Sequence, residues 1–212
     1  MSTQLIDAVL CDIDGVVRHW PASDIIEEAH GLPRGALAAA AFAPARLFPA
    51  ITGEVTDEQW RSAVAGDLTA VCGSADRAAA AVADWSALVP RVDPDVVALL
   101  TAVREVAAVA LVSNATTRLE WDLGRQGLTG LTGTVVNTAR IGLAKPDPRV
   151  YHIAADRVGV TPGRCLFVDD TEANVEAARR VGMTALHFRR AEDLRTALAP
   201  LLPAAGSRAG RP

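Results

Sequence analysis

The stretch of sequence that decides the fold is AVLCDIDGVV, at residues 8–17. It begins with four apolar residues, as expected of a short buried strand, and Asp12 and Asp14 follow at once. Because side chains alternate along an extended chain, carboxylates at positions i and i+2 point to the same side. Acidic side chains avoid the ends of buried strands unless their charge is used. The sequence therefore predicts a site for a hard cation, a phosphate group or both, with an ordinary polar loop as the alternative.

Lys145 is the second informative residue. The chain has 21 basic residues, and Lys145 is the one lysine among them. Lysine ends in a compact ammonium and arginine in a wide planar group, so the two are not interchangeable in a crowded site. The segment GLAKPDP, at residues 142–148, has the glycine and prolines of a loop. This pattern favours a position where a guanidinium does not fit, and the alternative is a chance result of composition.

Length and composition limit the class of protein. A chain of 212 residues is long enough for one substantial core and a smaller accessory domain. A net charge of −4 and a pI near 5.6 argue against nucleic acid or an anionic membrane as partner. No secretion signal precedes the first strand, and no apolar run reaches about 18 residues. The three cysteines, Cys11, Cys72 and Cys165, lack the spacing of metal ligands, so we expect a reduced, cytoplasmic protein.

Strand and helix patterns alternate along most of the chain. Near-continuous apolar stretches of strand length lie at residues 8–11, 106–112, 134–136, 165–168 and 184–188. Helical patterns lie between them at 94–104, 116–126, 148–158 and 172–181, and Gly127, Gly159 and Gly182 stand where helices would end. This alternation predicts an α/β fold, a doubly wound parallel sheet with helices on both faces. Ligands of such sheets bind at the carboxyl ends of the strands.

One segment interrupts this alternation. Residues 19–90 carry no strand signal but contain alanine-rich helical stretches at 35–43, 56–66 and 75–88. These stretches are separated by Pro33, Pro44, Pro49 and Gly53, and Thr56 is a plausible helix start. We predict a Rossmann-like core at 1–18 and 91–202, a small helical cap at 19–90 and a flexible tail at 203–212. The alternative for the insert is a peripheral helical decoration.

Polar residues follow four of the apolar runs. Asp12 and Asp14 follow the first run, Ser113 and Asn114 the second, and Asp169 and Asp170 the fourth, while Lys145 lies in the loop after the third. In one parallel sheet these endings converge on a single crevice. Carboxylates, an ammonium, a hydroxyl and an amide together suit a magnesium ion and a phosphate group.

These motifs, in this order, resemble the haloacid dehalogenase (HAD) superfamily. The likeness covers essentially the whole chain, and DxDG at 12–15 alone would be a weak signal. The run FVDDTEANVEAA at 167–178, followed by Gly182 and Met183, is similar to members with a helical cap after the first strand. Among these, the chain looks closest to the group that includes the phosphatase domain of soluble epoxide hydrolase and bacterial sugar-phosphate phosphatases.

The resemblance implies a magnesium-dependent hydrolase, a phosphatase that acts on small phosphomonoesters through an aspartyl-phosphate. It implies that Asp12 is the nucleophile and that Asp14 is the acid and then the base. It places Ser113, Asn114 and Lys145 on the phosphoryl oxygens. Magnesium would be bound by the Asp12 carboxylate, the Asp14 backbone carbonyl and Asp170, with Asp169 close by or acting through water. Asn174 would support the site or else be an ordinary surface amide.

Several alternatives stay open at this stage. Dehalogenases of this superfamily lack the second aspartate, so Asp14 argues against them. Phosphonoacetaldehyde hydrolases and the hexose-phosphate mutases with this cap use a cap lysine, which this chain lacks. The alternatives that remain are a phosphate-binding or regulatory protein with little turnover and, after it, a sugar-phosphate mutase.

We expect the substrate to be a small phosphorylated metabolite and the protein to be a monomer or homodimer. Arg18, His19 and Trp20 are candidates to face the leaving group. The cap arginines that could bind an anionic substrate are Arg34, Arg46 and Arg61, and the alternative is that most of them are ordinary surface charges.

Overall fold

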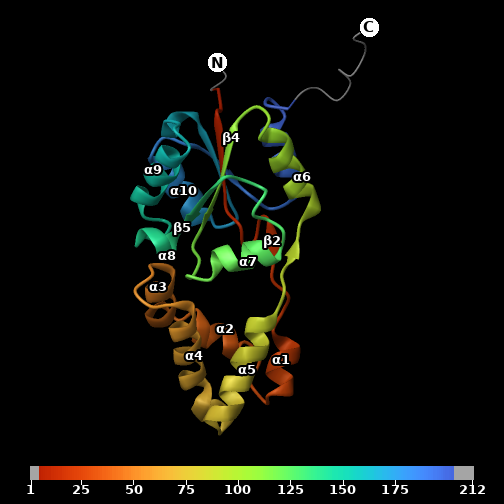
Figure 1. Cartoon of the computed structure of the whole chain (residues 1–212), viewed down its shortest axis with the longest axis vertical. Coiled ribbons are helices and arrows are strands. Elements are labelled where there is room, and N and C mark those ends of the chain that lie inside the picture. Colours follow the sequence, from red (N-terminus) through yellow and green to blue (C-terminus); the bar gives the residue numbers. More distant parts are fainter. Residues whose placement is uncertain (1–4, 203–212) are drawn as a thin grey trace.

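The computed structural model describes residues 5–202, so the tail predicted at 203–212 lies outside the described residues. Its centre is a five-stranded sheet with the order β5-β4-β1-β6-β7, in which every neighbouring pair is parallel (Figure 1). The five strands lie where the sequence predicts them, which confirms the α/β parallel fold. Their bounds are β1 Ala8–Cys11, β4 Ala108–Ser113, β5 Thr134–Asn137, β6 Cys165–Asp169 and β7 Thr184–His187.

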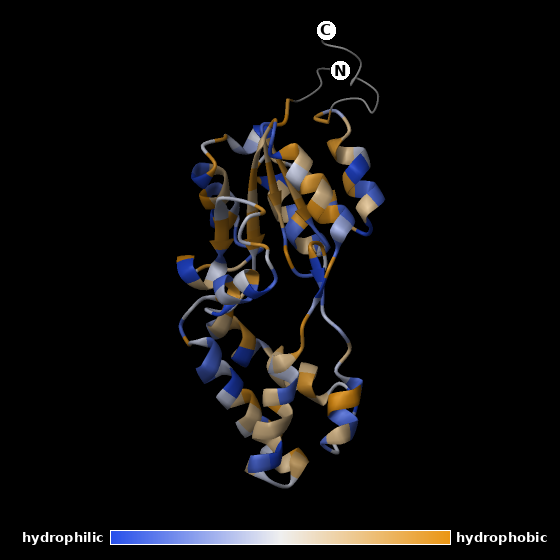
Figure 2. Ribbon diagram, turned by 45° about the vertical axis from the view of Figure 1, so that its right-hand side comes forward, coloured by the Kyte–Doolittle hydropathy of each residue, from blue (hydrophilic) through white to orange (hydrophobic). Residues whose placement is uncertain are grey.

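Helices cover both faces of the sheet. Successive side chains of a strand point to opposite faces, so each strand contributes to two hydrophobic clusters, one on each face. Val9 and Cys11 of β1 belong to one cluster, and Ala8 and Leu10 belong to the other. The strands are accordingly among the most hydrophobic segments of the ribbon in Figure 2. The helices of the first cluster are α6 Pro94–Val103, α7 Leu119–Arg125 and α11 Ala191–Leu198; those of the second are α9 Pro148–Arg157 and α10 Glu172–Arg180.

Strand register brings the ends of β1 and β6 together. Cys11 pairs with Leu111 on one side and with Val168 on the other. Just beyond this pairing, the backbone N–H of Asp12 donates to the Val168 carbonyl at 2.8 Å. Asp12 therefore emerges from the sheet directly beside Asp169, the last residue of β6.

A second group of helices follows β1 in the sequence and lies beyond the carboxyl ends of the strands (Figure 1). These helices enclose a hydrophobic cluster of their own. A short antiparallel ribbon of β2 Arg18–His19 and β3 Arg91–Val92 joins them to the sheet, and the sequence analysis does not predict it. The helices are α1 Asp24–Ala29, α2 Ala36–Ala41, α3 Pro44–Ile51, α4 Asp57–Cys72 and α5 Ala75–Ala87.

The start of α4 is confirmed, and the separating role given to two prolines is wrong. Thr56 caps α4, and its side chain and that of Gln59 form a reciprocal capping box. Pro44, however, begins α3 and Pro49 lies inside it. Proline is well tolerated at the first helical position, where its missing N–H has no intrahelical partner. Pro49 has no backbone N–H, so α3 lacks one of its intrahelical hydrogen bonds. The burial of Ile51 at the end of α3 stabilises the helix in spite of this loss.

Away from the sheet edge, the structure adds several helices to those predicted and buries the cysteines. Helices α1, α3, α11 and the short α8 Thr138–Ile141 have no counterpart in the sequence prediction. All three cysteines are buried free thiols, as expected for Cys11 and Cys165. Within residues 5–202, no helix combines the length and the apolarity that crossing a bilayer requires.

Candidate active site

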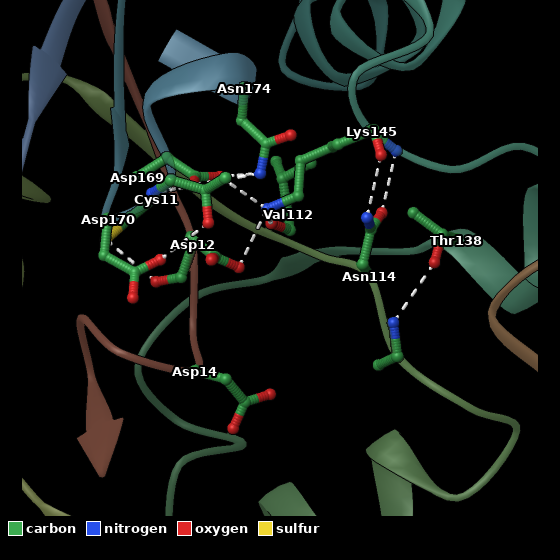
Figure 3. A network of polar contacts seen from close by, with 12 residues as sticks. Cys11, Asp12, Asp14, Val112, Asn114, Thr138, Lys145, Asp169, Asp170 and Asn174 are labelled. Carbon is green, nitrogen blue, oxygen red and sulfur yellow. Dashed lines mark hydrogen bonds and ion pairs between the residues drawn. The ribbon is translucent and has the colours of Figure 1, made fainter. Parts of the chain in front are cut away.

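Three carboxylates meet at the carboxyl ends of β1 and β6 (Figure 3). Oxygens of Asp12, Asp169 and Asp170 all lie within 4.8 Å of one another, and we call these residues the carboxylate cluster. Like charges this close repel one another unless cations balance them. Carboxylate oxygens are the ligands that a hard divalent cation prefers. The donor set therefore fits magnesium.

Lys145 supplies the buried positive charge of this site. Its ammonium lies 2.9 Å from Asp12 Oδ1, and it donates to Asp169 Oδ2 at 2.7 Å and to the Val112 carbonyl at 2.9 Å. The side chain is 1% exposed, so these three oxygens account for all three ammonium protons. Burial alone would lower the pKa of Lys145, but Asp12 and Asp169 outweigh it and raise that pKa above its usual value. The lysine is therefore a fixed cation.

The loop that carries Lys145 is tied to the end of β4 by Asn114. The Asn114 Nδ2 donates to the Lys145 carbonyl at 2.9 Å, and the Lys145 backbone N–H donates to Asn114 Oδ1 at 2.8 Å. Both ends of the amide are thus engaged with the backbone rather than free for a phosphoryl oxygen. Ser113, the last residue of β4, is buried beside Val112, whose carbonyl holds the lysine. Ser113, Asn114 and Lys145 thus lie at the same edge of the sheet, and their binding to phosphoryl oxygens stays a prediction.

Asp169 and Asp170 are neighbours in sequence with opposite surroundings. Asp169 is fully buried and accepts bonds from Lys145 Nζ, from Asn174 Nδ2 at 3.0 and 3.1 Å, and from the Thr171 N–H at 2.9 Å. Asp170 is exposed and accepts from the Thr171 hydroxyl at 3.3 Å. The protein therefore saturates Asp169 and leaves Asp170 open. Asn174, at the start of α10, orients Asp169 rather than facing solvent as a surface amide.

Burial and repulsion raise the pKa of Asp12 to about 7. Its burial is the main cause, Lys145 opposes it, and the nearby charge of Asp169 adds to it. Three carboxylates against one ammonium leave two negative charges when all are ionised, which equals the charge that a divalent cation balances. The electrostatics of the cluster thus agree with its ligand chemistry.

Gly15 allows Asp170 to approach the chain after β1. A Cβ atom at Gly15 would lie 2.0 Å from Asp170 Oδ2, and the glycine has a φ of +89°. Both facts exclude other residues, since a side chain would collide with the carboxylate and strain the backbone. The turn at Gly15 therefore helps to assemble the cluster.

Asp14 does not point the same way as Asp12, contrary to the sequence prediction. Its carboxylate accepts bonds from Arg18 Nε at 2.8 Å, Arg18 Nη2 at 3.2 Å and Trp20 Nε1 at 2.6 Å. Figure 3 shows it apart from the carboxylate cluster. The reason is that β1 ends at Cys11, so strand alternation no longer applies at Asp14. Asp14 instead lines a cavity beside the cluster.

This cavity has a volume of about 500 Å³ and lies between the sheet edge and the helices α2–α5. The helices contact the core through Asp57, the first residue of α4: Thr116 Oγ1 donates to Asp57 Oδ1 at 2.7 Å, and the Asp57 N–H donates to Thr117 Oγ1 at 3.0 Å. Residues on the core side of the cavity include Asp14, Asn114 and Thr116, and those on the helical side include Phe42, Trp60 and Trp85. Phe42, Trp60 and Trp85 are not among the residues predicted from the sequence, although aromatic residues are rare in this chain.

The predicted cap arginines do not form an anion site. Arg34 pairs with Asp24, and Arg46 pairs with Asp67 at 2.6 Å, both outside the cavity. Arg61 does line the cavity, but its Nε lies 2.6 Å from the Asp57 carboxylate. The idea that these residues bind an anionic substrate is therefore wrong for Arg34 and Arg46 and unsupported for Arg61.

Of the residues expected to face the leaving group, two line the cavity. These are Arg18 and Trp20, whereas His19 lies outside it, 3.9 Å from Asp93.

Comparisons with known proteins concern the family and the fold. A family model described as haloacid dehalogenase-like hydrolase matches residues 6–182. Phosphatase MT3486 of Mycobacterium tuberculosis is 43% identical over 68 residues, which are 32% of this chain and 31% of that protein. Glyceraldehyde 3-phosphate phosphatase of Methanopyrus kandleri is 32% identical over 100 residues, 46% of this chain and 43% of that protein. The chain thus spans less than half the length of either curated relative.

A similar fold has been solved with ligands. An HAD family enzyme of Bacteroides thetaiotaomicron, in complex with magnesium and inorganic phosphate, matches with a TM-score of 0.67 and 19% identity. The match covers 87% of this chain and 94% of the other. At this identity the likeness concerns the fold.

Proposed function

The chain belongs to the haloacid dehalogenase-like hydrolases, and on that premise we propose that it is a magnesium-dependent phosphatase of small phosphomonoesters. The observation that carries the proposal is the buried pair of Asp12 and Lys145, 2.9 Å apart, beside the open carboxylate of Asp170. A carboxylate held against a fixed cation beside a cavity is suited to attack a phosphoryl group.

In the first half-reaction, an Asp12 carboxylate oxygen attacks phosphorus and the bond between phosphorus and the ester oxygen breaks. Asp14 donates a proton to the departing alcohol, since its carboxylate lines the cavity that would hold the alcohol. The product on the enzyme is an aspartyl-phosphate at Asp12. Asp14 can donate this proton while Arg18 Nε and Trp20 Nε1 stay bonded to its Oδ1, because Oδ2 accepts the longer bond from Arg18 Nη2 at 3.2 Å and keeps a further lone pair.

In the second half-reaction, Asp14 removes a proton from water, and the water oxygen attacks phosphorus. The bond between phosphorus and the Asp12 oxygen breaks, which releases phosphate and restores the carboxylate. Lys145 stays protonated throughout and offsets negative charge beside Asp12. Ser113 would bind a phosphoryl oxygen through its hydroxyl. Because its side chain is engaged with the Lys145 loop, Asn114 would contribute its backbone N–H.

Magnesium would be held by the Asp12 carboxylate, the Asp14 backbone carbonyl and Asp170. Asp169 would act indirectly, since Lys145, Asn174 and the Thr171 N–H already use its oxygens. When bound, the cation supplies positive charge to the transferring phosphoryl group.

The helices would act as a cap. We assign residues 1–18 and 91–202 to the core and 19–90 to the cap, with the ribbon of β2 and β3 joining the two. The cap would exclude water from the phosphoryl group during attack by Asp12.

A single-turnover reaction in heavy-oxygen water tests this proposal. With nitrophenyl phosphate and magnesium, we expect a burst of nitrophenol and then release of phosphate that contains one labelled oxygen. The matched control is Asp12→Asn, which should give neither product. Label in the Asp12 carboxylate would show that water attacks the carboxyl carbon of the aspartyl-phosphate, which contradicts attack by water at phosphorus. Phosphate that stays on the protein would favour the binding-protein alternative.

A further inference from the structure

Aromatic side chains gather on the cavity beside Asp14. The chain has four tryptophans, and three of them, Trp20, Trp60 and Trp85, line this cavity together with Phe42. The ring centroids of Trp60 and Trp85 lie 5.7 Å apart at a tilt of 60°, and those of Phe42 and Trp85 lie 6.3 Å apart at 72°. Such tilted arrangements present ring faces and edges that favour another aromatic ring.

Part of this aromatic surface is not covered by the protein. Trp20 is 45% exposed and Phe42 is 55% exposed, although both line the cavity. Phe42 also lies outside the hydrophobic cluster that holds the helices together. Exposed rings that converge on one cavity are best explained by a ligand that covers them.

The charges in the cavity are already neutralised. Arg18 pairs with Asp14 at 2.8 Å, and Arg61 pairs with Asp57 at 2.6 Å. These are the two cationic side chains in the described lining. A third carboxylate there, Asp122, is paired with Arg118 at 3.0 Å. A second anionic group on a substrate would therefore lack a free cation in this cavity and would meet carboxylates.

We propose that the alcohol part of the substrate is an uncharged, planar aromatic group that stacks among Trp20, Phe42, Trp60 and Trp85. This inference rests on the proposed phosphatase function and defines its substrate class. A cavity of about 500 Å³ lies within the range that holds drug-sized ligands, and it exceeds what a three-carbon polyol fills.

The position of Trp20 connects the aromatic wall to the chemistry. Its indole N–H donates to Asp14 Oδ1 at 2.6 Å, and Arg18 lies over its ring at 5.1 Å. An aromatic ring stacked in the cavity thus has its ester oxygen near Asp14, the group that would protonate it. Binding energy from the ring can then be used to position the phosphoryl group at Asp12.

Three matched esters test this substrate class. Benzyl and cyclohexylmethyl phosphate have leaving groups of similar size, one planar and one not, and carboxyethyl phosphate carries a second anion. We expect kcat/KM for the benzyl ester to exceed both others by at least about tenfold, the effect of ring contacts worth one factor of ten. Equal values for the benzyl and cyclohexylmethyl esters, or a preference for carboxyethyl phosphate, would overturn the inference.

Variants locate the preference in the cavity. Phe42→Leu and Trp85→Leu should reduce the ratio of benzyl to cyclohexylmethyl kcat/KM towards one. The matched control is Trp121→Leu, an exposed tryptophan on α7 outside the cavity lining, which should leave the ratio unchanged. A ratio that survives both cavity substitutions would place aromatic recognition elsewhere.

Binding to a non-reacting protein separates this inference from the proposed function. In Asp12→Asn, calorimetry of intact benzyl and cyclohexylmethyl phosphate measures the same preference without turnover. Tighter binding of the benzyl ester with no hydrolysis by the unaltered protein would sink the phosphatase and keep the aromatic cavity. Hydrolysis of all three esters, together with equal binding of the benzyl and cyclohexylmethyl esters, would keep the phosphatase and sink the aromatic cavity.

Discussion

The edge of the sheet and the cavity beneath the helices are built in opposite ways. At the edge, Lys145 and Asp169 are 1% and 0% exposed, and their hydrogen-bonding groups meet partners within the protein. In the cavity, Trp20 and Phe42 leave 45% and 55% of their surface open. A saturated polar network resists rearrangement, whereas an open apolar wall can accept different ligands.

Under the proposed function, the reaction takes place at the edge and the cavity determines the choice of substrate. Substitutions at the edge should lower turnover for every ester by a similar factor. Substitutions in the cavity should change kcat/KM for some esters and not for others.

Asp12→Asn should give the largest effect, a loss of kcat of more than about a thousandfold, since an amide cannot form the aspartyl-phosphate. The loss should be the same for aromatic and aliphatic esters, in contrast to Phe42→Leu. Steady-state kinetics with both ester types measure it, and a thermal melt shows that the fold persists. Residual activity above about a thousandth of the original would rule out Asp12 as nucleophile.

Lys145→Arg should lower kcat by about a hundredfold, close to the effect of Lys145→Ala. The ammonium fits among oxygens of Asp12, Asp169 and Val112 at 2.7–2.9 Å, and a planar guanidinium is too wide for that space. Kinetics of the two variants decide it, with the melting temperature recorded for each.

The control is a conservative exchange at an exposed pair. Arg149 pairs with Asp147 at 2.6 Å on the surface, so Arg149→Lys should leave kcat unchanged. If Lys145→Arg kept most of its activity, the edge would be more tolerant than its saturated contacts indicate.

Asp169 and Asp170 should respond in different measurements. Asp170→Asn should raise the magnesium concentration for half-maximal activity by at least about tenfold and leave the melting temperature nearly unchanged. Asp169→Asn should shift the magnesium requirement less but lower the free energy of unfolding by about 3 kcal/mol, because it removes a buried partner of Lys145. Magnesium titrations and thermal melts of both variants measure this. A larger rise in the magnesium requirement for Asp169→Asn than for Asp170→Asn would show that Asp169, and not Asp170, is the direct ligand.

The edge of the sheet was predictable because strand geometry determines it. The apolar run at 8–11 and the run at 165–168 predict adjacent parallel strands, and their register places Asp12 beside Asp169. Lys145 was recognisable from its rarity among arginines. In a parallel sheet, the residues that follow the strands lie at one edge, so a local sequence pattern is enough to place Asp12 and Asp169.

Contacts made after the strands end were harder to predict. The direction of Asp14 depends on Arg18 and Trp20, which fold back on it after the turn at Gly15. The two bonds of the Asn114 amide to the Lys145 backbone join loops 31 residues apart. No periodicity encodes such contacts, because irregular backbone has no fixed side-chain direction.

The aromatic cavity was not predictable for a related reason. Phe42, Trp60 and Trp85 come from three separate parts of the helical segment, and they converge only when α4 and α5 pack together. Helical periodicity identifies a buried face but not the angle at which two helices cross. The proline within α3 also kept this helix from being predicted, and Ile51 of α3 lines the cavity.

The smallest predicted effect concerns stability of the metal-free protein. Burial raises the pKa of Asp12 from 3.8 to about 7 in the folded protein. A group whose pKa is raised by folding stabilises the protein at low pH, and that contribution is lost as pH rises through the folded value. With a chelator present, the melting temperature of the unaltered protein should therefore fall relative to that of Asp12→Asn between about pH 5 and about pH 7.

The expected difference is at least about 1 kcal/mol, or roughly 3 °C for a chain of this size. Magnesium should remove it at the higher pH, because the cation balances the charge that Asp12 acquires there. Phe42→Leu provides the contrast, since an apolar substitution in the cavity should shift the melting temperature equally at both values of pH. Parallel pH profiles for the unaltered protein and Asp12→Asn would show that Lys145 already compensates the charge of Asp12. The edge would then be electrostatically complete without a cation, as the cavity is.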